Sequence, residues 1–280
     1  MWYSCSKAGS RMLDALHGSA KIRWERMCMP RKKTGTPGPF VRTVELVRER
    51  IEQPKKYPYS IPAVRALDRL ELHPKVTFLI GENGTGKSTI LEALAVACGM
   101  NAEGGSQNFN FSTRASHSGL HECLRIGRSF AMPKLKYFLR AETFYNVATE
   151  IESVGVAGSY GGSLHERSHG ESFFALLQNR FEDCGLYFMD EPEAALSPSR
   201  QVQFLGLMHN LCLRGSQFVI ATHSPIIMAY PEARVYLFDS KGIQETTYKQ
   251  TDHYLVTRGF LNNPDAMISI ITGKKARDAV

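Results

Sequence analysis

Apolar and polar positions along the chain follow patterns that predict strands alternating with helices. Short apolar or alternating runs predict strands at 67–73, 76–80, 109–112, 186–189, 217–221 and 234–238. Segments typical of helices lie at 89–97, 120–126, 143–151, 171–181 and 201–213. Residues 41–50 fit either an edge strand or a first helix. Strands that alternate with helices imply an α/β fold, in which helices cover a mostly parallel sheet.

A glycine-rich turn between the strand at 76–80 and the helix at 89–97 has the pattern G-x-x-x-x-G-K-[ST]. Such a turn directs backbone N–H groups at a phosphate chain, and the following helix presents its N-terminus to the same group. Lys87 is expected to reach the β- and γ-phosphates, and Ser88 to offer a hydroxyl to Mg²⁺. The pattern predicts an ATP site formed by Gly81, Glu82, Asn83, Gly84, Thr85, Gly86, Lys87, Ser88 and Thr89.

Two carboxylates follow the apolar strand at 186–189. In an open α/β sheet such strand ends face the ligand crevice. Asp190 is therefore placed to hold Mg²⁺ together with Ser88, and Glu191 to act as the general base on the attacking water. Read alone, Asp-Glu-Pro is also a good helix or turn start, but the phosphate loop favours the catalytic interpretation.

Charge separates the first 36 residues from the rest. The net charge of the chain is +7, and residues 1–36 contribute +6 of it, which leaves a nearly neutral body. The basic segment is expected to be a disordered extension, followed by an ATPase domain over 37–280. One alternative is a targeting or membrane-surface helix, because Leu13, Leu16, Ala20 and Trp24 fall near one helical face, and another is that translation starts at Met27 or Met29. Nucleic acid stays a candidate partner that the charge of the body does not support.

Cysteines and hydropathy indicate the compartment. The six cysteines form no C-x-x-C pair, which argues against zinc and against a disulfide scaffold and suits a reducing cytoplasm. No apolar run approaches the roughly 18 residues of a membrane span, so no integral membrane segment is expected.

Three further segments resemble motifs of ATP-binding-cassette (ABC) ATPases. Asp-Glu-Pro-Glu-Ala-Ala-Leu-Ser-Pro at 190–198 is similar to their second nucleotide motif, and Ile-Ala-Thr-His-Ser-Pro at 220–225 to their switch-histidine strand. Ser-His-Gly-Glu-Ser at 168–172 stands where their signature belongs, although it departs from Leu-Ser-Gly-Gly-Gln. From about residue 40 onward the chain resembles a family of single-domain bacterial ATPases of the AAA type with an ABC-like core.

The resemblance implies a P-loop NTPase fold of the ABC type with a small helical subdomain within 113–183. It also implies that His223 contacts the γ-phosphate. Ser168 and Gly170 of one chain would close on the ATP of another, which predicts an ATP-dependent homodimer with two composite sites. Gln107 and Glu142 are alternative candidates for the residue that couples the γ-phosphate to a partner, and Tyr59 or Tyr57 for the aromatic that stacks on adenine.

The expected function is ATP hydrolysis by a soluble ABC-like ATPase that acts on an unidentified macromolecule. One alternative is the ATP-binding subunit of an ABC transporter, which would be expected to carry a clear coupling glutamine and a standard signature. Another is a DNA-repair or chromosome-type ATPase head, although the 81 residues from Lys87 to Ser168 leave no room for a long coiled coil. A nucleotide-gated binding module without hydrolysis is disfavoured because Glu191 is present.

Overall fold

The computed structural model describes residues 39–102, 104–106, 118–141 and 169–273. Its centre is a sheet whose strand order is β10-β9-β3-β8-β7-β6-β4. β9, β3, β8, β7 and β6 run parallel, and the edge strands β10 and β4 are antiparallel to their neighbours. In that order the strands are Gly242–Thr246, Arg234–Asp239, Val76–Gly81, Gln217–Ala221, Gly185–Asp190, Leu135–Arg140 and Gly105–Ser106.

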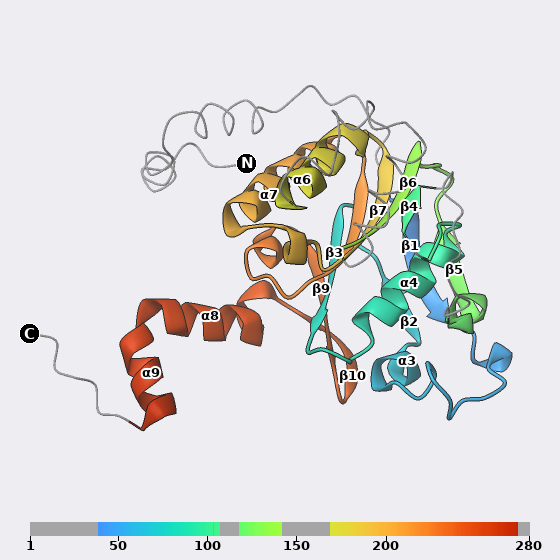
Figure 1. Ribbon diagram of the computed structural model, residues 1–280. Coiled ribbons are helices and arrows are strands. Elements are labelled where there is room, and N and C mark those ends of the chain that lie inside the picture. Colours follow the sequence, from blue (N-terminus) through green and yellow to red (C-terminus); the bar gives the residue numbers. More distant parts are fainter. Residues whose placement is uncertain (1–38, 103, 107–117, 142–168, 274–280) are drawn as a thin grey trace, which may run out of the picture.

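Helices cover both faces of this sheet (Figure 1). α6 (His169–Arg180) and α7 (Pro198–Leu213) pack on one face, and α4 (Lys87–Ala97) packs on the other. Alternate residues of each central strand feed two separate cores, because successive side chains of a strand point to opposite faces. Phe218 and Ile220 of β8 belong to the core under α6 and α7, whereas Val219 and Ala221 belong to the core around α4.

A second, antiparallel sheet lies beyond α4, with the order β2-β1-β5 (Figure 1). Its strands are Arg69–Glu71, Val41–Leu46 and Leu124–Arg128. Residues 41–46, for which an edge strand or a helix was expected, form β1, the central strand of this sheet, and a short 3-10 helix follows at 48–50. Short elements complete this side, namely η1 (Arg48–Arg50), α3 (Pro62–Ala66) and η2 (Gly119–Cys123).

Gln217, at the start of β8, ties the two sheets together. Its buried side chain accepts hydrogen bonds from the amides of Phe40 and Val41 at 2.9 and 3.0 Å. It donates to the carbonyls of Val41 and His73 at 2.8 and 3.1 Å. All of the hydrogen-bonding capacity of one buried amide is therefore used to hold β1 and the end of β2 against the central sheet.

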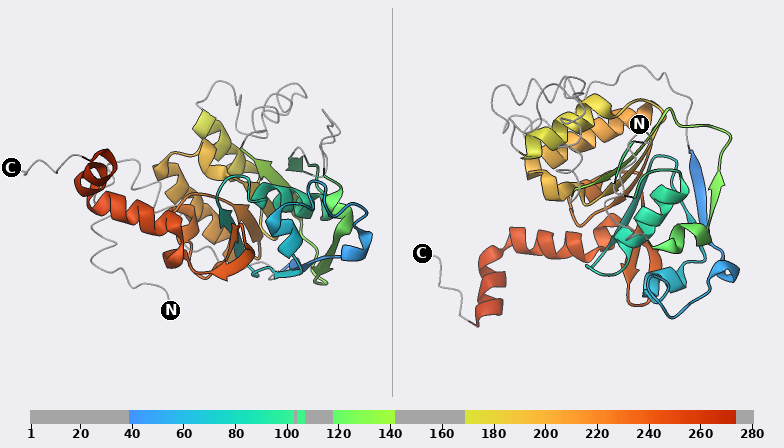
Figure 2. Two further views of the ribbon diagram at one scale, coloured as in Figure 1. Left: turned by 90° about the horizontal axis from the view of Figure 1, so that it is seen from below. Right: turned by 45° about the vertical axis from the view of Figure 1, so that its right-hand side comes forward.

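The C-terminal part of the described chain leaves the body. After η4 (Pro192–Ala195), η5 (Ile227–Ala229), and η6 (Tyr248–Gln250), the chain forms α8 (Asp252–Asn262) and α9 (Pro264–Thr272). Figure 2 shows both helices projecting away from the sheets. Neither helix contains a buried residue.

The predicted α/β fold with a mostly parallel sheet is confirmed, with local differences. The helix expected at 120–126 is wrong, because η2 ends at Cys123 and β5 then pairs with β1. β6 was not predicted, since Leu-Lys-Tyr-Phe-Leu-Arg has neither strict alternation nor a long apolar run. α8 and α9 were not predicted either. The strand expected at 109–112, the helix at 143–151, the extension 1–36 and residues 113–117 and 142–168 of the helical subdomain lie outside the described residues.

Candidate nucleotide-binding site

The phosphate loop spans the turn from the end of β3 to the start of α4, as expected. Gly81 adopts φ +138°, and a Cβ there would lie 2.1 Å from the carbonyl oxygen of Phe238, so only glycine fits. Gly86 caps α4 with φ +98°, and a Cβ on it would lie 2.7 Å from Cγ2 of Ile61. Two positions of the loop thus require glycine for conformation and for space.

Lys87 lies buried in the first turn of α4. Its Nζ donates to the carbonyl oxygens of Gly81 and Glu82, both at 2.9 Å. Burial lowers the pKa of Lys87, and the carboxylates of Glu191 and Asp190 oppose that shift. The loop therefore holds an ammonium group among backbone dipoles, where an anionic phosphate would be a stronger acceptor.

Ser88 and Asp190 meet between α4 and the end of β7. Ser88 Oγ donates to Asp190 Oδ1 at 2.9 Å. Arg140 Nε lies 3.7 Å from Asp190 Oδ2, while Arg140 Nη1 forms a 2.8 Å ion pair with Glu92. A hydroxyl and a carboxylate are the hard oxygen donors that Mg²⁺ takes, and their proximity fits a shared ion.

Glu191 has a left-handed backbone, with φ 47° and ψ 53°. Its amide donates to the carbonyl of Ala221 at 2.9 Å, which anchors this turn to the end of β8. The Glu191 side chain keeps 39% of its surface exposed, and its Oε1 lies 3.5 Å from Nε2 of His223. The structure thus brings the predicted base and the predicted γ-phosphate contact together.

His223 follows Thr222 at the end of β8. Burial lowers the pKa of His223, and the nearby ammonium of Lys87 acts in the same direction, which favours a neutral imidazole. Within the described part of the chain, its buried Nε2 has no hydrogen-bond partner. A polar atom left in this way beside the phosphate loop suits a ligand oxygen that arrives with the nucleotide.

Sequence reasoning missed two residues around His223. Glu193 accepts a short hydrogen bond from the backbone amide of His223, and burial raises the pKa of its carboxyl. His253 Nε2 lies 3.3 Å from Nδ1 of His223. Glu193 belongs to the Asp-Glu-Pro-Glu run and could have been noticed there. His253 stands 30 residues beyond His223 without a recognisable motif.

The remaining predicted residues are placed as follows. The Tyr59 hydroxyl lies 3.3 Å from Sγ of Cys123, and burial raises the pKa of Tyr59 to about 12. The hydroxyl of Tyr59 therefore has a partner within the protein. Tyr57 is 67% exposed, with its hydroxyl 3.5 Å from Oγ1 of Thr89. Gly170 is the second residue of α6. Ser168, Gln107 and Glu142 lie outside the described residues.

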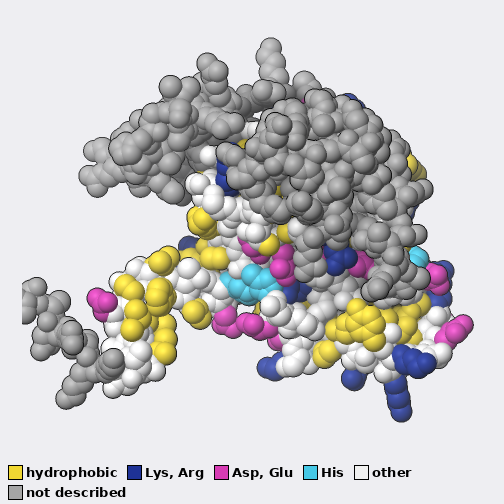
Figure 3. Space-filling model, in the orientation of Figure 1, with side chains coloured by type: hydrophobic (Ala, Val, Ile, Leu, Met, Phe, Trp, Pro, Cys, Tyr) yellow, Lys and Arg dark blue, Asp and Glu magenta, His cyan; other side chains and the backbone are white. Residues whose placement is uncertain are grey.

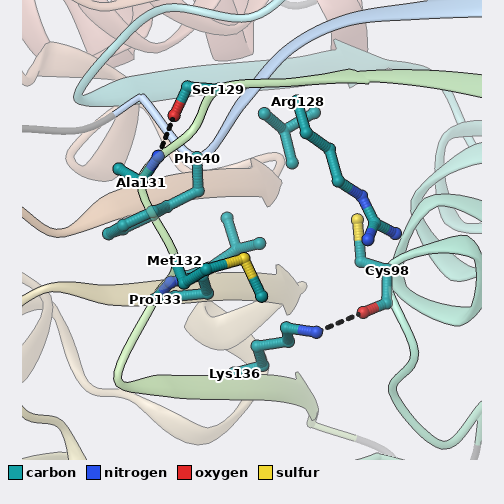
Figure 4. A pocket seen from close by; sticks show the side chains of 10 residues that line it. Phe40, Cys98, Arg128, Ser129, Ala131, Met132, Pro133 and Lys136 are labelled. Atoms are coloured by element: carbon teal, nitrogen blue, oxygen red, sulfur yellow. Dashed lines mark hydrogen bonds between the residues drawn. The ribbon is translucent and has the colours of Figure 1, made fainter.

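A small pocket lies at the other end of α4 and does not belong to this site (Figure 4). Its volume is about 20 Å³, room for little more than one water molecule. Lys136 Nζ crosses it to the carbonyl of Cys98 at 2.9 Å, and burial raises the pKa of the Cys98 thiol to about 11. A thiol in that state is not a nucleophile at neutral pH. The residues that line the pocket are Phe40, Val41, Cys98, Arg128, Ser129, Ala131, Met132, Pro133, Lys136 and Leu186.

The phosphate loop on β3 and the paired carboxylates at the end of β7 define a P-loop nucleotide-binding domain. Family models of AAA domains match two separate segments of the chain. Residues 60–142 match a family described as "AAA domain", and residues 163–229 one described as "AAA domain, putative AbiEii toxin, Type IV TA system". Two segments of the chain thus match AAA-type P-loop ATPase domains, and the curated relatives below are ABC-type ATP-binding proteins.

Curated ATP-binding proteins are similar to part of the chain. The chain is 29% identical over 168 residues to the cytochrome c biogenesis ATP-binding export protein CcmA of Rhodopseudomonas palustris, covering 56% of this chain and 82% of that protein. It is 26% identical over 192 residues to the ribose import ATP-binding protein RbsA of Roseobacter denitrificans. That second similarity covers 59% of this chain and only 37% of the relative.

Two solved structures align with the chain at low identity. The SMC head domain from Thermotoga maritima aligns with a TM-score of 0.42 at 16% identity, covering 75% of this chain and 99% of that one. The cbiO1 protein of Clostridium perfringens, part of an ABC transporter complex, aligns with a TM-score of 0.43 at 16% identity, covering 84% and 100%. Among the residues that the structure describes, no helix is both long and apolar enough to cross a membrane.

Proposed function

We propose that this domain hydrolyses ATP to ADP and phosphate. The observation that carries the proposal is the arrangement at the end of β7, where Asp190 contacts Ser88 at 2.9 Å and Glu191 turns toward His223. Four groups that act on a γ-phosphate thus converge from three separate elements. Bound Mg²⁺, held by Ser88 and Asp190, would neutralise charge on the β- and γ-phosphates.

The residues divide the chemistry between them. Lys87 Nζ exchanges its backbone carbonyl partners for phosphate oxygens and stabilises the charge that develops in the transition state. Glu191 accepts a proton from the attacking water as the water oxygen bonds to the γ-phosphorus and the bond to the ADP oxygen breaks. His223 donates a hydrogen bond to the γ-phosphate and loses this contact when phosphate leaves.

Two further parts of the proposal concern assembly and location. The start of α6, with Gly170 in its first turn, would face the ATP of a second copy of the chain together with Ser168, giving an ATP-dependent homodimer. Glu142, next in sequence after Ala141 at the end of β6, and Gln107 stay candidates for coupling to a partner. A reducing compartment such as the cytoplasm stays a prediction from the cysteine pattern, and no disulfide joins Cys98, Cys123, Cys184 and Cys212 among the described residues.

Glu191→Gln tests the mechanism and the assembly together. We expect phosphate release to fall by roughly 10²- to 10⁴-fold while ATP still binds, because the amide keeps the shape of the carboxylate and loses its basicity. Under saturating Mg²⁺-ATP, light scattering should report a dimer of this variant.

Glu232→Gln is the matched control. Glu232 is exposed and pairs with Lys75 just before β3, at the opposite end of the parallel strands, so turnover should not change. Undiminished phosphate release by Glu191→Gln would contradict the hydrolytic role. A strictly monomeric variant under saturating ATP would contradict the dimer.

A further inference from the structure

His253 reaches the candidate site from outside all the motifs described above. It lies in the first turn of α8, and its ring centroid is 5.4 Å from that of His223. Thr251, which is buried, caps the helix by accepting a hydrogen bond from the amide of Tyr254. The cap fixes where α8 begins, and so fixes His253 against His223. Figure 3 shows histidine side chains gathered beside acidic groups where α8 meets the body.

The contact between two neutral imidazoles requires one donor and one acceptor. The atoms are Nδ1 of His223 and Nε2 of His253, 3.3 Å apart. If His223 donates from Nδ1, its Nε2 carries a lone pair. If His253 donates from Nε2, the proton of His223 stands on Nε2 instead. The partner ring thus sets the tautomer of His223.

The surroundings of His223 favour the second arrangement. Nε2 of His223 lies 3.5 Å from Oε1 of Glu191, and a lone pair facing a carboxylate would be repelled whereas an N–H is attracted. Burial lowers the pKa of both imidazoles, which supports two neutral rings that must share one hydrogen bond. Only a His223 with its proton on Nε2 can donate to a phosphate oxygen.

We propose that His253 is a positioning residue that donates from Nε2 to Nδ1 of His223 and thereby holds His223 in the tautomer that presents an N–H to the γ-phosphate. This inference rests on the proposed function for the role of His223, but the tautomer itself is a property of the nucleotide-free protein. It also ties the start of α8 to the same side chain that contacts the γ-phosphate.

The first test reads the tautomer directly. In the ¹⁵N NMR spectrum of the nucleotide-free protein, with His223 assigned through His223→Gln, we expect a protonated Nε2 and an unprotonated Nδ1. A protonated Nδ1 on neutral His223 would overturn the proposal, whether or not the protein hydrolyses ATP.

The second test compares three substitutions of His253. Gln can donate from its Nε2 amide in place of the ring and should keep kcat within about twofold. Phe fills the space without donating and should lower kcat about tenfold, with KM for ATP little changed, because positioning affects the chemical step. Glu only accepts, so it should move the proton of His223 to Nδ1 and lower kcat further.

His209→Gln serves as the control, because His209 also forms a histidine contact, to the Tyr230 hydroxyl at 3.2 Å, but lies on α7 away from the site. Equal losses for Gln and Phe at position 253, or an unchanged His223 tautomer in His253→Glu, would contradict the proposal. A wild-type protein without turnover would contradict the proposed function alone, since the NMR result would still stand.

Discussion

The central strands and the C-terminal helices differ in burial, although both bring a residue to the candidate site. Every residue of β3, β7 and β8 is buried, and the catalytic candidates stand directly at or after their ends. α8 and α9 contain no buried residue and expose large apolar side chains, among them Leu261, Ile270 and Ile271. The two regions nevertheless meet at His223 and His253, whose ring nitrogens lie 3.3 Å apart. The strands thus position the candidate residues by packing, whereas α8 reaches them through this contact between two rings.

Replacing an isoleucine by alanine in each region should show the difference in burial most strongly, as a difference in unfolding free energy. Ile220→Ala in β8 removes a fully buried side chain and should lower the free energy of unfolding by about 2–5 kcal/mol. Ile270 in α9 is 77% exposed, and Ile270→Ala should change stability by no more than about 0.5 kcal/mol. Urea unfolding measures both. Similar losses for the two variants would show that α9 is covered in the protein in solution.

Two substitutions of glutamine test whether the hydrogen bonds of Gln217, which join the two sheets, also stabilise the fold. Gln217→Leu leaves the amides of Phe40 and Val41 without their acceptor and should destabilise the fold by about 2 kcal/mol or more. Gln244→Leu, on the exposed face of β10, should change the free energy of unfolding by less than about 0.5 kcal/mol. Equal losses of unfolding free energy for the two variants in urea would show that the hydrogen bonds of Gln217 stabilise the fold no more than an exposed side chain does.

Acid should weaken the body through its partly buried histidines. Burial lowers the pKa of His73, His209, His223 and His253. The unfolded chain then binds more protons, so stability is present above the ordinary histidine pKa of about 6.5 and is lost as pH falls below it toward the folded pKa values. Glu193, whose pKa is raised, acts in the opposite direction.

His73→Asn isolates one of these histidines. The His73 ring accepts from the amides of Lys75 and Val76, and an Asn oxygen can take over that role without titrating. Between pH 7 and 5.5 the loss of stability should be smaller in the variant, by a difference on the order of 1 kcal/mol or less. Parallel pH curves of unfolding free energy would rule out a contribution from His73.

The smallest expected effect is a gain in the C-terminal helices. Gly259 lies inside α8, and an added Cβ would meet nothing within 4 Å. Gly259→Ala should therefore stabilise α8 locally by about 0.5–1 kcal/mol, because alanine loses less backbone entropy in a helix. Hydrogen exchange of the α8 amides measures this local stability, with Ile270→Ala as a control that leaves the α8 backbone unchanged. Slower exchange is expected only in the glycine variant.

The candidate site could be predicted where a motif and a strand end coincide. The phosphate loop, Asp190, Glu191 and His223 each follow a buried strand, and parallel strands deliver their carboxyl ends to one edge of a sheet. In the structure Ser88 Oγ lies 2.9 Å from Asp190 Oδ1, and Glu191 Oε1 lies 3.5 Å from Nε2 of His223. Tyr59 had no such support, and the structure ties its hydroxyl to Cys123.

The sequence by itself determined the phosphate loop, the two carboxylates and the alternation of strands and helices, because these depend on residues close together in the chain. Tertiary structure alone decided that residues 41–46 pair with 124–128 and that Gln217 spans two sheets. It also decided that His253 faces His223, 30 residues away. Those contacts join segments whose local patterns do not specify a partner, so only the packing of the whole domain brings them together.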